Sequence, residues 1–193
     1  MEETFKPQVL KYMMKGLEKY RNLAVFDIPV WRVRVGKYLG DGKYDWEPDR
    51  GQMLSLGDSW KASYDCAWIF RADLLVPPSV AGENVYLEID FGGEALVKIN
   101  GKIAGAVSSG WVNRDSIYLG RLAGGEKLEI KLEYAVDAGS FCDAAMDGAK
   151  NVKYELKKAR LVSADEACRA YETDLNIAWE ALNYIEDEYI RSK

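Results

Sequence analysis

Histidine is absent from this chain of 193 residues, and its absence excludes several kinds of active site. Without imidazole there is no Ser/His/Asp or Cys/His nucleophile pair and no histidine-ligated zinc site. A histidine base poised near neutral pH is also excluded. Any chemistry of these residues would therefore have to use carboxylates, lysine, tyrosine or cysteine.

Carboxylates occur in two clusters, and a pair of carboxylates can hydrolyse a glycoside without histidine. The clusters are Asp41, Asp45, Glu47 and Asp49, then Asp143 and Asp147. Neither follows the Asp/Asn spacing with a terminal Glu of a common calcium loop, and no glycine-rich nucleotide loop is present. We interpret both clusters as solvated loop faces, with a single structural cation as the alternative.

Three of the six tryptophans lie in loop-like, glycine-containing contexts: Trp46, Trp60 and Trp111. An exposed indole face can pack against the apolar face of a sugar ring, so these residues are candidates for carbohydrate contact. Tryptophan is also highly buried on average, which favours packing in the core or against another domain. Both interpretations stay open, and we assign no catalytic, cofactor-binding or metal-binding residue.

The overall composition disfavours several partners. Lys and Arg number 26 against 31 Asp and Glu, and no long basic run offers a phosphate-backbone surface, so nucleic acid is not an expected partner. Cys66, Cys142 and Cys168 lack metal or redox spacing and are expected to be reduced thiols. Charged residues interrupt the first 23 positions, and no stretch approaches a membrane span, which predicts a cytoplasmic protein with no membrane partner.

Strand patterns dominate the middle of the chain. From Val30 apolar and polar residues alternate, and apolar-rich runs then recur at short intervals, at residues 68–76, 85–91, 95–99, 102–107, 116–119, 127–135 and 152–162. The segment 36–57 has no sustained period and is predicted to be a long ordered loop. Asn100 and Gly101 predict a type I′ hairpin turn. About eight short strands are typical of a two-sheet jelly roll.

A helix is predicted on each side of the strands. Residues 8–22 are amphipathic, and Ser163 with Glu166 predicts a capping box at the start of a long helix whose apolar stripe runs from Cys168 to Tyr189. The stripe could cover the sandwich, the first helix or a further domain. Because Lys193 follows no Gly or Pro stop signal, we expect the polypeptide to continue. The expected division is 1–29 N-terminal helical segment, 30–162 β-sandwich and 163–193 helix leading towards an absent catalytic domain.

Several strings in the sandwich resemble a known family. Trp68, Phe70 and Arg71, followed by Val76 and Pro77, are similar to a strand near the start of many sugar-hydrolase β-sandwich domains. The Gly-Glu-Ala-Leu-Val string at 93–97, placed after Leu87 and Asp90 and before Asn100 and Gly101, resembles the N-terminal domain of glycoside hydrolase family 38 α-mannosidases. The upstream pair Gly57 and Trp60 also fits. The resemblance covers almost the whole chain.

This resemblance implies a mainly β, galactose-binding-like jelly roll flanked by helices, acting as a non-catalytic accessory domain. The parent polypeptide would be a retaining α-mannosidase with a zinc ion in its catalytic domain, which is the expected partner. The family's zinc ligands include histidine, so no cofactor is expected in this chain and no catalytic residue is transferred. The family often has an acidic residue and a histidine soon after the hairpin, where residues 105–109 read Gly-Ala-Val-Ser-Ser.

Two other functions stay open at this point. The sandwich could bind carbohydrate independently, through one of the three loop tryptophans. It could instead be an accessory domain of a β-galactosidase-like hydrolase. A His-x-Asp motif encoded beyond Lys193 would favour the α-mannosidase.

Overall fold

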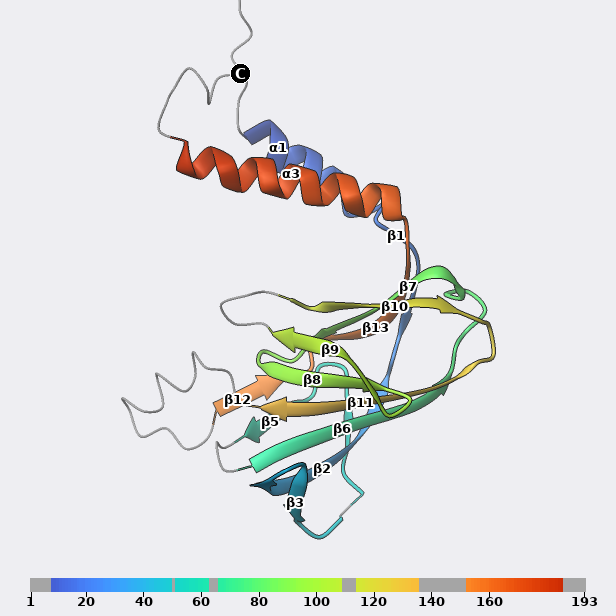
Figure 1. The fold of residues 1–193 in the computed structure, drawn as a ribbon, viewed down its shortest axis with the longest axis vertical. Coiled ribbons are helices and arrows are strands. Elements are labelled where there is room, and N and C mark those ends of the chain that lie inside the picture. The colour runs from blue at the N-terminus through green and yellow to red at the C-terminus, as the bar shows by residue number, and fades with distance from the viewer. Residues whose placement is uncertain (1–7, 50, 63–65, 109–113, 136–151, 186–193) are drawn as a thin grey trace, which may run out of the picture.

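The structure is a computed structural model that describes residues 8–49, 51–62, 66–108, 114–135 and 152–185. Two antiparallel sheets face each other (Figure 1), which confirms the predicted β-sandwich. The four-stranded sheet has the order β1 (Asn22–Asp27), β13 (Lys158–Ala164), β7 (Gly82–Asp90), β10 (Ser116–Leu122). Among the described residues, no helix is both long and apolar enough to cross a membrane.

The larger sheet contains seven strands. Its order is β3 (Lys43–Trp46), β2 (Val30–Gly40), β6 (Cys66–Leu75), β11 (Lys127–Ala135), β8 (Glu94–Ile99), β9 (Lys102–Ser108), with β4 (Met53–Ser55) also paired to β2. A separate ribbon pairs β5 (Ser59–Ala62) with β12 (Val152–Glu155). Alternate residues of the facing strands, such as Leu87 in β7 and Ile130 in β11, are fully buried between the sheets, as the period of two requires.

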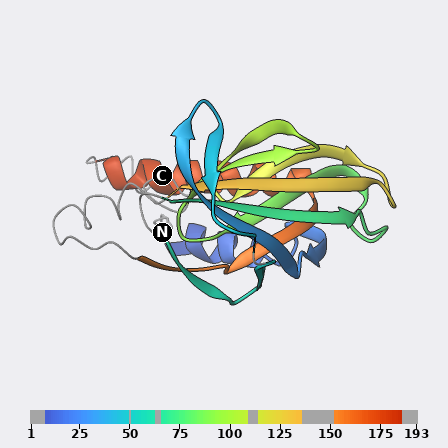
Figure 2. The ribbon, with the colours of Figure 1, turned by 90° about the horizontal axis from the view of Figure 1, so that it is seen from below.

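Both helices lie on one side of the sandwich, along the outer face of the four-stranded sheet (Figures 1 and 2). The helices are α1 (Gln8–Leu17) and α3 (Glu166–Tyr184), and they pack side by side. Leu10 of α1 and Leu175 of α3 are buried, and Lys11 Nζ lies 4.6 Å from the ring centre of Trp179. The first helix is therefore at least part of what the predicted apolar stripe covers.

Several predicted boundaries are wrong. The first helix ends at Leu17 and β1 follows, so residues 18–22 do not extend it. The segment 36–57 is not a long loop, because the end of β2, all of β3 and all of β4 lie within it. The predicted strand 152–162 is two strands that belong to different sheets.

The start of α3 also differs from the predicted capping box. Ser163 lies in β13, and Asp165 is the residue that caps the helix, since its carboxylate accepts a hydrogen bond of 2.9 Å from the Cys168 backbone N–H. Serine and aspartate are both favoured as the N-cap residue of a helix, so Ser163 and Asp165 are both candidates from the sequence. Pairing of β13 with β1 and β7 extends the strand past Ser163 and so selects Asp165.

The predicted hairpin turn is confirmed. Asn100 and Gly101 join β8 to β9, and both have the positive φ that a type I′ turn requires, 48° and 78°. We expect Gly101→Ala to lower the free energy of unfolding by about 1 kcal/mol, because a Cβ disfavours this conformation. Gly16→Ala, inside α1 with open space around it, is expected to raise it by up to about 1 kcal/mol.

Urea unfolding of the two variants measures these opposite effects. Equal midpoints for Gly101→Ala and the unsubstituted chain would contradict the strain assigned to the turn.

Candidate functional site

Trp60 belongs to the core. Its side chain is 4% exposed. Among the described residues, five aromatic rings have centroids within 6.2 Å of it, those of Trp68, Phe70, Phe91, Tyr134 and Tyr154. β5 presents the ring from the ribbon that it forms with β12. The indole is therefore enclosed by the chain's own side chains and offers no open face to a sugar.

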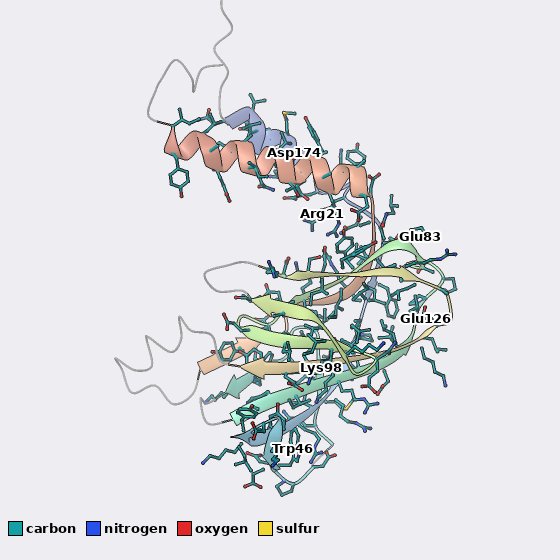
Figure 3. The ribbon with its side chains drawn as sticks, viewed as in Figure 1. Arg21, Trp46, Glu83, Lys98, Glu126 and Asp174 are labelled. Atoms are coloured by element: carbon teal, nitrogen blue, oxygen red, sulfur yellow. The ribbon has the colours of Figure 1, made fainter. Side chains whose placement is uncertain are left out.

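Trp46 lies at the end of the molecule that is distant from the helices (Figure 3). The Arg34 guanidinium is 4.4 Å from its ring centre, and the Tyr44 ring centroid is 4.8 Å away. Trp46 pairs with Gly36 and Tyr44 with Tyr38, so Arg34 and Tyr44 approach the indole from opposite directions along the hairpin. The half-buried ring is therefore partly occupied by contacts within the chain.

The remaining sequence candidates do not assemble into a site in the described residues. Trp111, Asp143 and Asp147 lie outside them. Asp41 and Asp45 are exposed on the β2–β3 hairpin. Among the residues that the structure describes, no group of three or more His, Cys, Asp or Glu side chains is placed to hold a metal ion.

A carboxylate that sequence reasoning missed is the most enclosed charge of the described residues. Glu88 in β7 is 2% exposed and lies on the helix-facing side of its sheet. Its Oε2 accepts hydrogen bonds from Arg160 in β13, with Nε at 2.8 Å and Nη2 at 2.7 Å. Its Oε1 is 2.9 Å from Nη2 of Arg169 in α3 and 3.6 Å from Nη2 of Arg21. We call these four residues the Glu88 clamp.

The clamp joins the sandwich to both flanking segments. Arg169 lies in the first turns of α3, and Arg21 follows α1 at the junction between the helices and the sandwich (Figure 3). The Arg169 guanidinium also lies 4.1 Å from the ring centre of Tyr86, whose hydroxyl donates to Glu166 over 2.7 Å. The buried carboxylate and the Tyr86–Glu166 hydrogen bond thus hold the start of α3 against the sheet.

The electrostatics of the clamp disfavour acid/base chemistry. Burial alone would raise the pKa of Glu88, but hydrogen bonds and charges from Arg160, Arg21 and Arg169 together lower it below its ordinary value. A general acid needs the opposite shift. Burial, with the hydrogen bond to Glu166, raises the pKa of Tyr86 to about 12, so its hydroxyl stays protonated. The clamp therefore positions structural elements.

No local signal marks Glu88 in the sequence. It lies between Leu87 and Ile89, both buried in the core, so the period of two places it on the outer face, where a glutamate is ordinarily solvated. Only the approach of α3 and of the segment after α1 encloses it.

Apolar side chains lie exposed on the helix pair and on the sheet beside it. On the helices they are Val9, Tyr12, Met13, Tyr171, Ile177 and Tyr184. Leu23, Val25 and Tyr118 are exposed on β1 and β10. We call these nine residues the helix-side surface. Exposed apolar side chains on neighbouring elements are candidates for contact with a partner.

Comparison with known proteins gives one family. A family model described as "Alpha-mannosidase, jelly roll domain" matches residues 32–162. No curated protein sequence matches the chain. A β-glucuronidase from Faecalibacterium prausnitzii is 14% identical with a TM-score of 0.49, over 74% of this chain and 32% of the enzyme. The chain thus spans about a third of that solved structure.

A second solved structure is more distant. The GH31 α-xylosidase from Xanthomonas citri is 14% identical with a TM-score of 0.31, over 75% of this chain and 18% of that enzyme.

Removing the charge of Glu88 should destabilise the protein strongly. Glu88→Gln leaves the partly buried Arg160 and Arg169 without their anion and Arg21 with Glu172 alone, and we expect it to lower the free energy of unfolding by about 3–5 kcal/mol. Chemical denaturation measures the loss. The control is Glu83→Gln, which removes an exposed ion pair with Arg121 and should change stability by less than about 0.5 kcal/mol.

The contribution of the clamp should also depend on pH. The pKa of Glu88 is lower in the folded than in the unfolded chain, so its stabilisation is fully present above the unfolded value of about 4.3. It is lost as pH falls through the folded value. The stability difference between the unsubstituted chain and Glu88→Gln should therefore shrink in acid. A difference that persists unchanged to pH 2 would contradict the ionic nature of the clamp.

Proposed function

The chain belongs to the family of α-mannosidase jelly roll domains, and from this membership we propose that it is the non-catalytic N-terminal accessory domain of a glycoside hydrolase acting on α-mannosides. The observation that supports this most is the extent of the match. Residues 32–162 run from β2 into β13 and include most strands of both sheets. The matched unit is therefore the sandwich itself.

The chemistry of the described residues supports a non-catalytic role. Glycoside hydrolysis requires one carboxylic acid that can donate a proton and a second carboxylate on the other side of the bond. Glu88 is held ionised by arginines, and Glu133 likewise has its pKa lowered, because hydrogen bonds from Lys98 and Lys131 outweigh its burial. Both groups are suited to ion pairing.

Zinc, by resemblance, belongs to the catalytic domain of such a hydrolase. The family's ligand set includes histidine, and this chain has none. The residues present therefore do not fit that site, and the accessory role requires no metal from them. We propose a cytoplasmic location, since the cysteines show no disulfide-framework spacing.

The proposed partner is the catalytic domain of the same polypeptide, docked on the helix-side surface. Tyr12, Met13 and Ile177 offer exposed apolar area, and tyrosine and methionine are favoured at the centre of interfaces. The Glu88 clamp fixes the start of α3, so the surface is held at a set angle to the sandwich before docking. A fixed surface loses less conformational entropy when a partner binds.

The isolated chain is expected to hydrolyse no aryl α-mannoside. Release of nitrophenol from nitrophenyl α-mannoside measures this, and mannose-specific turnover by the purified 193-residue chain would refute the non-catalytic role. A second experiment uses an antibody against the domain to recover the natural polypeptide. That polypeptide should hydrolyse the α-mannoside and leave the nitrophenyl β-galactoside intact. The reverse preference would assign the domain to a β-galactosidase-like hydrolase.

Docking predicts slower amide exchange in the natural polypeptide. Burial of the helix pair against the catalytic domain should slow hydrogen exchange in α1 and α3 by about tenfold or more relative to the isolated chain, since local opening must then break the interface. Hydrogen exchange with mass spectrometry measures this, with β11 in the core as internal control. Equal exchange of the helices in both samples would place the interface elsewhere.

A further inference from the structure

A depression of about 470 Å³ lies on the outer face of the seven-stranded sheet. Its lining residues are Asp73, Leu74, Leu75, Asn100, Lys127, Leu128 and Glu129. They come from β6, β11 and the β8–β9 turn, beside the turn that contains Glu126 (Figure 3). The depression is on the opposite sheet from the helices. Its volume is within the usual range for small-molecule sites.

Two carboxylates stand side by side in this depression. Asp73 and Glu129 are directly opposite in the pairing of β6 with β11, an arrangement in which like charges destabilise a sheet. Arg71 holds both, with Nε 3.0 Å from Asp73 Oδ2 and Nη2 2.7 Å from Glu129 Oε2. Carboxylate oxygens accept more than one hydrogen bond each, so both groups keep acceptor capacity towards a ligand.

Asn100 is fixed beside these carboxylates. Its backbone N–H donates to the Glu129 carbonyl over 2.9 Å, and its Oδ1 accepts from the Glu129 backbone N–H over 2.8 Å. The side-chain amide therefore has its NH₂ left to donate. Lys127 also lines the depression, and its ammonium can donate three hydrogen bonds.

The depression also has an apolar side. Leu75 is 59% exposed at the end of β6. Core packing therefore does not require a leucine at this position. Leu74 and Leu128 lie below it. An apolar patch next to paired acceptors and donors matches a hexose, which has hydroxyl groups at its edge and C–H groups on one ring face.

We propose that this depression binds a neutral hexopyranoside, with Asp73 and Glu129 accepting from adjacent hydroxyls, Asn100 donating, and Leu75 contacting the apolar ring face. The site is separate from Trp46 and Trp60, and its occupation does not require the accessory role proposed above. Arg71 contacts both carboxylates, so neither is placed as a proton donor, and the site binds without reacting. Arg71 and Lys127 balance the charge of the two carboxylates, so the site has no net positive charge that would select an anionic sugar.

Amide NMR of the labelled chain tests the proposal. The probes are methyl α-mannopyranoside, methyl β-galactopyranoside and glucuronate. We expect saturable shift changes around residues 73–75, 100 and 127–129 with at least one neutral glycoside. The dissociation constant should be about millimolar, because a small ligand in an open site makes few contacts. Glucuronate should bind no more tightly than the neutral glycosides, because the site has no net positive charge.

Three substitutions separate the site from general surface effects. Asp73→Ala and Leu75→Ser should each weaken binding, Asp73→Ala by about tenfold, since hydrogen bonds to charged groups are the stronger ones. Both side chains are largely exposed, and the amide spectrum itself reports whether each variant is folded. The control Glu83→Ala, on the other sheet, should bind normally.

Absence of saturable shifts with both neutral glycosides would overturn the proposal. So would unchanged affinity in Asp73→Ala, or glucuronate binding more tightly than the neutral sugars. None of these results bears on α-mannoside turnover, so the failure of this site and the failure of the proposed accessory role are distinguishable.

Discussion

The placement of the helix pair depends on one buried charge. A carboxylate withdrawn from water is costly unless cations and hydrogen bonds replace its solvation. For Glu88 these come from Arg160 within the sheet, from Arg169 on α3 and from Arg21 after α1. Moving α3 away would leave Glu88 with fewer counter-charges. The ionic requirement of one side chain thereby becomes a geometric constraint on three segments far apart in the chain.

The two sheets of the sandwich have different outer surfaces. The four-stranded sheet presents the Glu88 clamp and exposed apolar residues beside the helices, which suits contact with a protein domain. The seven-stranded sheet presents ion-paired side chains, among them Arg71 with Asp73 and Glu129. Between them the aromatic cluster around Trp60 fills one end of the core. The two outer faces therefore match the two proposals, a docking surface on the helix side and a sugar site on the seven-stranded sheet.

Prediction from sequence succeeded where local patterns and burial agree. Strand β11 lies at 127–135 as predicted, because Leu128, Ile130, Leu132 and Tyr134 alternate with charged residues and are buried in the core. The turn at Asn100 and Gly101 followed from backbone conformational preference alone. The segment 36–57 was mistaken for a loop since β3 and β4 are short edge strands with few buried residues. Both are strands because their backbones pair with β2, and their composition does not indicate this pairing.

The sequence by itself determined the sandwich, its family and the absence of histidine chemistry, because alternation, turn residues and composition are local properties of the chain. Tertiary structure decided which aromatic and charged side chains are buried and what they contact. Trp60 entered the core, Trp46 packed against Arg34 and Tyr44, and Glu88 was buried under α3. Solvation of a side chain depends on what distant segments place over it, and no local pattern encodes that.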